Sequence, residues 1–150
     1  MSVGVLTPEQ LDALLREPIV ARLATTTDEG YPYIVPVWTE WDGEAAWLVI
    51  RAKAEFARHL VARPKVALSI VRPDDPDTRA LILGRAEVLE GPGPLEGRTL
   101  DIAERMGRRY EGEAGQAYVE ESRDWPRLLV RIVPEQIVSW TGGDWHLRYR

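Results

Sequence analysis

The feature that most constrains this chain is a series of strand-like segments joined by turns too short for a crossover connection. The segments 19–26, 33–41 and 45–51 are rich in alternating apolar, β-branched and aromatic residues, which is typical of strands. Turn signals separate them, first Asp28-Glu29-Gly30 and then Asp42-Gly43. Because a parallel pair needs a connection of a dozen or more residues, the three strands are predicted to be antiparallel.

The rest of the chain alternates between helix-like and strand-like patterns. Helices are predicted at 7–16, 54–63, 95–110 and 113–122, and further strands at 65–71, 78–90 and 127–140. Gly84 suggests a bulge or a bend in the long fifth strand, and Pro134 interrupts the last one. We therefore predict an α+β fold that is mainly β, a six-stranded antiparallel split β-barrel with flanking helices, formed by one domain over residues 1–150.

Composition excludes several classes of function. The net charge is −5 and the 19 Lys and Arg are scattered, which argues against a nucleic-acid partner. The chain has no cysteine and only two histidines, so no metal site is expected. Its start shows neither a basic signal region nor a long apolar run, so we expect no membrane association and a cytoplasmic location. Motifs of hydrolases, phosphate-binding loops and metalloproteases are also missing, and no catalytic residue is assigned.

Three features remain as candidates for a binding site. Pro36 lies within a strand, which fits either an edge strand or a position beside a ligand. Arg51-Ala52-Lys53 leads into the helix at 54–63, so two cations and free helical N–H groups converge where a phosphate or only solvent could lie. Six tryptophans are many for 150 residues, and the segment from Trp140 to Trp145 could wall a site from the C-terminal side.

These features together resemble the pyridoxamine 5′-phosphate oxidase-like family of FMN-binding split barrels. The matching segments, in chain order, are Arg22-Leu23-Ala24-Thr25 with Asp28-x-Gly30-x-Pro32, Val35-Pro36-Val37-Trp38, Arg58-His59-Leu60 with Arg63-Pro64-Lys65-Val66-Ala67-Leu68, and Gly84-Arg85-Ala86. The resemblance covers about residues 5 to 90 in these segments and the remainder by layout only. It implies a homodimer with two identical cofactor sites at the subunit interface.

The resemblance also implies where the cofactor would lie. The ring would rest near Val35, Pro36, Val37, Trp38, Val49 and Ile50, and the phosphate near Arg51, Ala52, Lys53, Phe56 and Arg58. One departure concerns the Arg-Lys pair with which the oxidases grip the phosphate, because Glu55 and Phe56 stand at the aligned positions. Arg51, Lys53 and Arg58 are the cations that could replace that pair.

The function expected from this resemblance is a flavin-dependent oxidoreductase. It would bind FMN, or alternatively a deazaflavin coenzyme, and transfer hydride to or from a small organic substrate. A second hypothesis is a binding protein that holds a flavin, a deazaflavin or haem without turnover. A third is a dimeric scaffold whose site has decayed, with Glu55 now repelling phosphate. Fold membership alone does not choose among the three.

Overall fold

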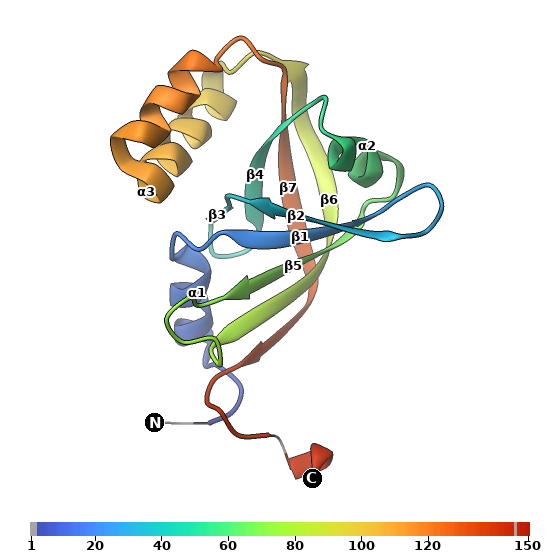
Figure 1. Cartoon of the computed structure of the whole chain (residues 1–150), viewed down its shortest axis with the longest axis vertical. Coiled ribbons are helices and arrows are strands. Elements are labelled where there is room, and N and C mark those ends of the chain that lie inside the picture. Colours follow the sequence, from blue (N-terminus) through green and yellow to red (C-terminus); the bar gives the residue numbers. More distant parts are fainter. Residues whose placement is uncertain (1–2, 146) are drawn as a thin grey trace.

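The computed structural model describes residues 3–145 and 147–150. Its elements are α1 (Pro8–Arg16), β1 (Ala21–Thr26), β2 (Pro32–Val37), β3 (Glu40–Trp41), β4 (Ala46–Arg51), α2 (Glu55–Ala62), β5 (Lys65–Val71), β6 (Arg79–Gly93), α3 (Gly97–Glu121), β7 (Arg127–Trp140) and a 3₁₀ helix (Leu147–Tyr149). Figure 1 shows α3 beside one end of the curved sheet and both chain ends at the opposite end of the molecule. No described helix is long and apolar enough to cross a membrane.

All strand pairs in the described sheet are antiparallel, and their order is β2-β1-β5-β6-β7-β4-β3. The two edge strands, β2 and β3, are consecutive in the chain and only Trp38 and Thr39 connect them. Two residues reach from one edge to the other only if the sheet curls until its edges meet. The result is an open, split barrel, and the predicted α+β fold is confirmed.

The predicted strand over 33–41 is wrong in one respect, because the structure divides it into β2 and β3 and the sheet therefore has seven strands rather than six. The backbone N–H of Thr39 donates to the hydroxyl of Tyr110 on α3 (3.1 Å) instead of to a neighbouring strand. Sequence periodicity misses this break because both halves are strand-like. We call the Trp38-Thr39 connection the seam of the barrel.

Gly84 and Pro134 face each other at an irregularity in the longest strand pair. The β6–β7 register shifts between Leu83 and Gly84, which confirms the predicted bulge. A Cβ on Gly84 would lie 2.6 Å from the Val133 carbonyl oxygen, so a side chain there has no room. The bulge also accommodates Pro134, so β7 continues from Arg127 to Trp140 instead of being interrupted.

The main core fills the barrel and consists mostly of leucine, isoleucine, valine and alanine side chains. Its fully buried members include Leu14, Leu23, Leu48, Leu68, Ile82, Val130 and Ile132. The helix α1 covers one end of it and begins with a capping box, in which Gln10 N–H donates to the Thr7 hydroxyl (3.2 Å) and Thr7 N–H donates to the Gln10 side chain (2.9 Å). This confirms the N-terminus predicted for that helix.

The element α3 is a helical hairpin rather than one straight helix. Glu111 and Gly112 have non-helical backbone angles, and Gly112 adopts φ +56°. The two halves touch where glycines face each other, because a Cβ on Gly115 would lie only 1.9 Å from the Gly107 carbonyl oxygen. The helices predicted at 95–110 and 113–122 are therefore confirmed as two arms. They pack on the sheet through two small clusters, one with Ala103 and Val119 and the other with Ile102 and Met106, separate from the barrel core.

Candidate functional site

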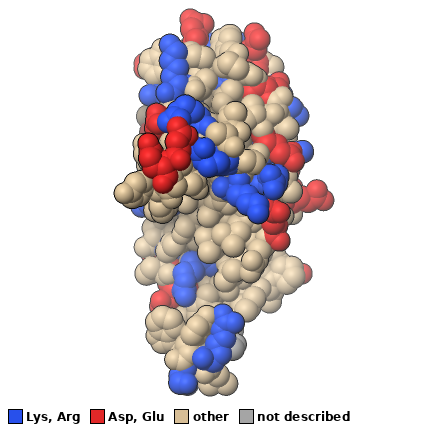
Figure 2. Space-filling view, turned by 90° about the vertical axis from the view of Figure 1, so that its right-hand side faces the viewer, with Lys and Arg blue, Asp and Glu red and all other residues tan. Residues whose placement is uncertain are grey.

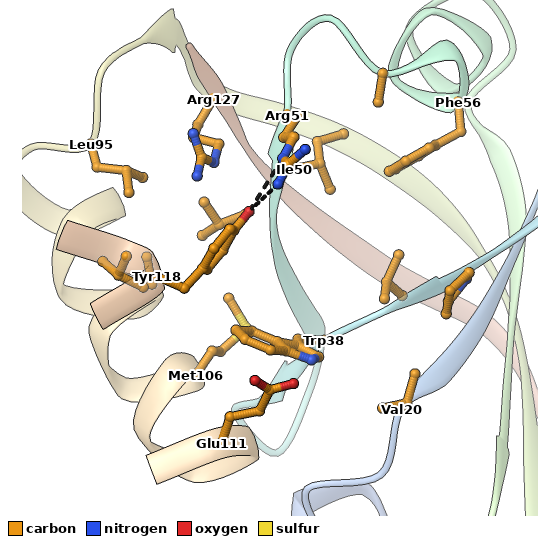
Figure 3. Close-up of a pocket in the computed structure, with 16 residues that line it drawn as sticks. Val20, Trp38, Ile50, Arg51, Phe56, Leu95, Met106, Glu111, Tyr118 and Arg127 are labelled. Atoms are coloured by element: carbon orange, nitrogen blue, oxygen red, sulfur yellow. Dashed lines mark hydrogen bonds between the residues drawn. The ribbon is translucent and has the colours of Figure 1, made fainter. Parts of the chain in front are cut away.

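A cleft of about 510 Å³ lies between the α3 hairpin and the seam of the barrel (Figure 3). Its residues come from β2 and the seam, from β4, from the start of α2, from both arms of α3, from the start of β7, and from the segments that precede β1 and α3. They are Val20, Pro36, Val37, Trp38, Val49, Ile50, Arg51, Ala54, Phe56, Leu95, Ala103, Met106, Glu111, Tyr118, Val119 and Arg127. Mostly apolar walls with a few polar groups are the usual composition of a small-molecule site, and the volume falls in the usual range. We call it the α3 cleft.

The alternation of β4 determines how that strand contributes to the cleft. Ile50 belongs to the barrel core, whereas Val49 packs against the clusters formed with α3. Arg51, two positions after Val49, therefore projects to the α3 side, as Figure 3 shows. Trp38 forms an aromatic wall at the seam, where its ring stacks on Tyr110 at 5.3 Å between centroids. Val49, Arg51 and Trp38 come together in the cleft only because the sheet curls until β2 and β3 meet.

Arg51 is held in place by aromatic groups. Its Nε and Nη2 donate to the Tyr118 hydroxyl at 3.2 and 2.8 Å. Its guanidinium also lies 4.9 Å from the centroid of the Trp125 ring, which is a cation–π distance. Tyr118 and Trp125 therefore orient the cation without neutralising its charge.

A second arginine, Arg127, lies opposite Arg51 in the β4–β7 register. Only 4% of it is exposed, and its guanidinium donates to the carbonyl oxygens of Ser122 (3.1 Å) and Trp125 (2.8 Å) and to the Ser122 hydroxyl (2.6 Å). Burial, together with the nearby charge of Arg51, lowers the pKa of Arg127 below its usual value. The group nevertheless stays protonated at neutral pH, as arginine does in proteins.

The two guanidiniums give one end of the cleft a net positive charge. Among the residues that the structure describes, no carboxylate forms an ion pair with Arg51 or Arg127. Ala54, which precedes α2, also lines the cleft, and no side chain caps that helix. Guanidiniums and free helical N–H groups are donors that suit a phosphate, so the residues present fit a phosphorylated cofactor at this end.

Arg58 does not contribute to this charge. It forms ion pairs with Asp28 (2.8 Å) and with Glu55 on its own helix, and it is not among the residues that line the cleft. Hydrogen bonds from Arg58 are the main cause that lowers the pKa of the Asp28 carboxyl and the pKa of the Glu55 carboxyl. Glu55, at a position where the oxidases are expected to carry a cation, is thus partly neutralised within α2.

The other residues suggested by the sequence divide into two groups. Pro36, Val37, Trp38, Val49, Ile50, Arg51 and Phe56 line the α3 cleft, whereas Val35, Ala52, Lys53 and Arg58 do not. Val35 and Ala52 pack against the barrel core instead. Pro36 lies on β2, an edge strand, which confirms the edge position expected for that proline, and it also lines the cleft.

The idea that Trp140 to Trp145 wall the same site is wrong for the single chain. Trp140 and Trp145 line a different cleft with Val138 and Tyr149. Conversely, no pattern in the sequence selected Arg127, Tyr118 or Glu111, which also line the α3 cleft. One signal for Arg127 was its position directly before the apolar run Leu128-Leu129-Val130. A strand that is buried on both faces rarely begins with an unpaired cation, so an arginine there indicates a partner or a ligand.

Comparison with known proteins supports the interpretation of this geometry. Residues 7–141, almost the whole chain, match the model of the pyridoxamine 5′-phosphate oxidase family. The chain belongs to this family. No curated protein matches this family member closely enough to count as a relative.

Solved structures of the same fold include proteins with different named roles. An F420 reductase is 26% identical, with a TM-score of 0.66, over 84% of this chain and 94% of that one. A conserved hypothetical protein from Mycobacterium tuberculosis is 25% identical, with a TM-score of 0.74, over 94% and 88%. The heme storage protein HutZ from Vibrio cholerae is 22% identical, with a TM-score of 0.66, over 90% and 95%, and shows the fold alone.

Proposed function

We propose that this family member is a flavin-dependent oxidoreductase that binds FMN or a deazaflavin coenzyme in the α3 cleft. The observation that carries the proposal is the polarity of the cleft, which joins an apolar aromatic chamber to two arginines without carboxylate partners among the described residues. A flavin cofactor has this same division into a flat ring and a phosphorylated chain. The proposal includes a homodimer, a small organic substrate and a cytoplasmic location.

The residues of the cleft would hold the two parts of the cofactor separately. Arg51 and Arg127 would donate hydrogen bonds to the phosphate, and Arg51 is already oriented by Tyr118 and Trp125. Trp38, Val49 and Met106 would contact the ring and exclude water from it. The bound flavin supplies the hydride chemistry. The protein therefore needs no acid–base residue at its centre to take part in the reaction.

FMN and a deazaflavin coenzyme each have one line of support. Family membership supports a flavin, and the likeness to a reductase named for F420, a deazaflavin, supports the alternative. Both coenzymes carry a phosphate and a tricyclic ring, so both suit the same cleft. The arginine pair predicts that the phosphate contributes strongly in either case.

The homodimer is supported by apolar side chains that remain exposed on the sheet. Leu81 and Val138 are paired across β6 and β7, and both are exposed, as are Leu83 and Ile34. Figure 2 shows a broad uncharged area below a belt of charged residues on one face of the molecule. An exposed apolar area of this kind is typical of an interface between subunits. Sedimentation at micromolar concentration tests it, and a monomer would contradict this part of the proposal.

The deciding experiment compares FMN with riboflavin, which has the same ring but no phosphate. Quenching of tryptophan fluorescence reports binding of both to the wild type, to Arg51→Gln and to the control Arg58→Gln. Arg51→Gln should remove one charge-assisted hydrogen bond to the phosphate, which contributes about 1.5–3 kcal/mol to binding. The affinity of this variant for FMN should therefore be about tenfold to one-hundredfold weaker than that of the wild type. Riboflavin affinity should change little, and Arg58→Gln should bind both flavins like the wild type because Arg58 is already paired with Asp28 and Glu55.

The opposite pattern would refute the proposed site. If Arg58→Gln weakened FMN binding and Arg51→Gln did not, the phosphate would lie outside the α3 cleft, beside α2. If neither FMN nor the deazaflavin coenzyme bound to the wild type, the flavin function itself would fail. Turnover is tested separately, by reducing the bound flavin with dithionite without oxygen and following its reoxidation by added acceptors.

A further inference from the structure

Glu111 is the single carboxylate among the described residues that line the α3 cleft. It stands where the two arms of α3 meet, with non-helical angles of φ −139° and ψ 15°, and Gly112 follows with φ +56°. The break turns the chain so that the side chain of Glu111 reaches the cleft. Figure 3 shows Glu111 at the end of the cleft away from Arg51 and Arg127, with Trp38 between them in this view.

Within the described part of the chain, no hydrogen bond or ion pair engages the Glu111 carboxylate. The nearby arginines of α3 are directed elsewhere. Arg105 donates to Glu40 (both bonds 2.9 Å), and Arg109 donates to the carbonyl oxygens of Thr39 (3.3 Å) and Arg16. The negative charge at this end of the cleft is therefore available to a ligand.

The cleft thus has charges of opposite sign at its two ends. Arg51 and Arg127 form the positive end and Glu111 lies at the other, and apolar residues such as Val49 and Met106 also line the cleft. A cofactor whose phosphate occupies the positive end leaves the Glu111 end for a second molecule. The Glu111 carboxylate supplies the charge that attracts a cation, and Trp38, which is stacked on Tyr110, supplies an aromatic wall for a flat group.

We propose that Glu111 is a specificity-determining residue that selects substrates with a positively charged or strongly hydrogen-bond-donating group on a flat ring. This inference rests on the proposed function, because it assigns the second ligand of the same cleft. Glu111 acts on binding rather than on hydride transfer. Removing its charge should therefore affect the affinity for cationic ligands and leave the affinity for the flavin unchanged.

The test uses benzamidinium and benzoate, two flat probes of similar size and opposite charge. Calorimetric titration measures both with the wild type, with Glu111→Gln and with the matched control Glu113→Gln, which lies on the same hairpin but does not line the cleft. Each titration is run with and without bound FMN. With FMN bound, so that the Arg51 and Arg127 end is occupied, the wild type should prefer benzamidinium. Glu111→Gln should weaken benzamidinium binding about three- to fivefold while benzoate binding improves, as expected for an exposed charge pair. Glu113→Gln should behave like the wild type.

The possible outcomes separate this inference from the proposed function. If FMN binds but benzamidinium affinity is the same in Glu111→Gln as in the wild type, or falls equally in Glu113→Gln, the role of Glu111 is refuted and the flavin site stands. Equal affinity of the FMN-bound wild type for the two probes, or no binding of benzamidinium, also refutes it. If benzamidinium binding depends on Glu111 but no flavin binds, the charge selection stands and the proposed flavin function fails.

Discussion

The contact between Gly107 and Gly115 makes a sharp prediction about the hairpin that forms one wall of the α3 cleft. A Cβ added at Gly115 would lie 1.9 Å from the Gly107 carbonyl oxygen and 2.5 Å from its carbon, far inside any real contact. Gly115→Ala must therefore separate the two arms. Separation costs about 3 kcal/mol, the upper part of the usual range for overpacking, because the atom that must move is backbone. The better helix propensity of alanine offsets about 1 kcal/mol.

The expected net loss in the free energy of unfolding is thus about 2 kcal/mol, or a decrease in Tm of about 4–8 °C for a chain of this size. Urea unfolding, followed by circular dichroism, measures it. Gly93→Ala is the matched control, because a Cβ there meets nothing within 4 Å. FMN affinity should fall in Gly115→Ala as well, since Tyr118 and Val119 on the second arm line the cleft. If Gly115→Ala were as stable as Gly93→Ala, the close approach of the two arms would be wrong.

Two further predictions concern the barrel. Gly84→Ala should lower the free energy of unfolding by about 1–3 kcal/mol, because its Cβ would lie 2.6 Å from the Val133 carbonyl oxygen; unchanged urea unfolding would contradict the tight bulge. Hydrogen bonds from Arg58 and then Arg63 lower the pKa of Asp28 below 3.8, so its contribution to stability is complete above that value and is lost as the pH falls through the lowered pKa. Asp28→Asn should therefore have a lower urea midpoint than the wild type at neutral pH and a smaller loss of stability on acidification, and parallel pH profiles for the two proteins would refute the role of Asp28.

Much of the barrel follows from local sequence signals. The alternation over 45–51 and the Asp42-Gly43 turn specify β4 and its antiparallel neighbour, because side chains of a strand point alternately to opposite faces. The capping pattern at Thr7 specifies the start of α1. The division of 33–41 at Trp38 and Thr39 could not be predicted in this way, because it depends on a hydrogen bond from Thr39 to Tyr110, a residue 71 positions away.

The candidate site, too, could be predicted only in part from local sequence signals. Local patterns predicted most of the strands and helices, and together with the family resemblance they marked Pro36, Trp38, Val49 and Arg51. Arg127 and Glu111 reach the same cleft, and Arg58 turns away to Asp28, through contacts between distant segments. Strand and helix preferences cannot predict such contacts because they act over a few neighbouring residues. The charge of a site, by contrast, depends on which distant side chains the closing of the barrel and the folding of the α3 hairpin place together.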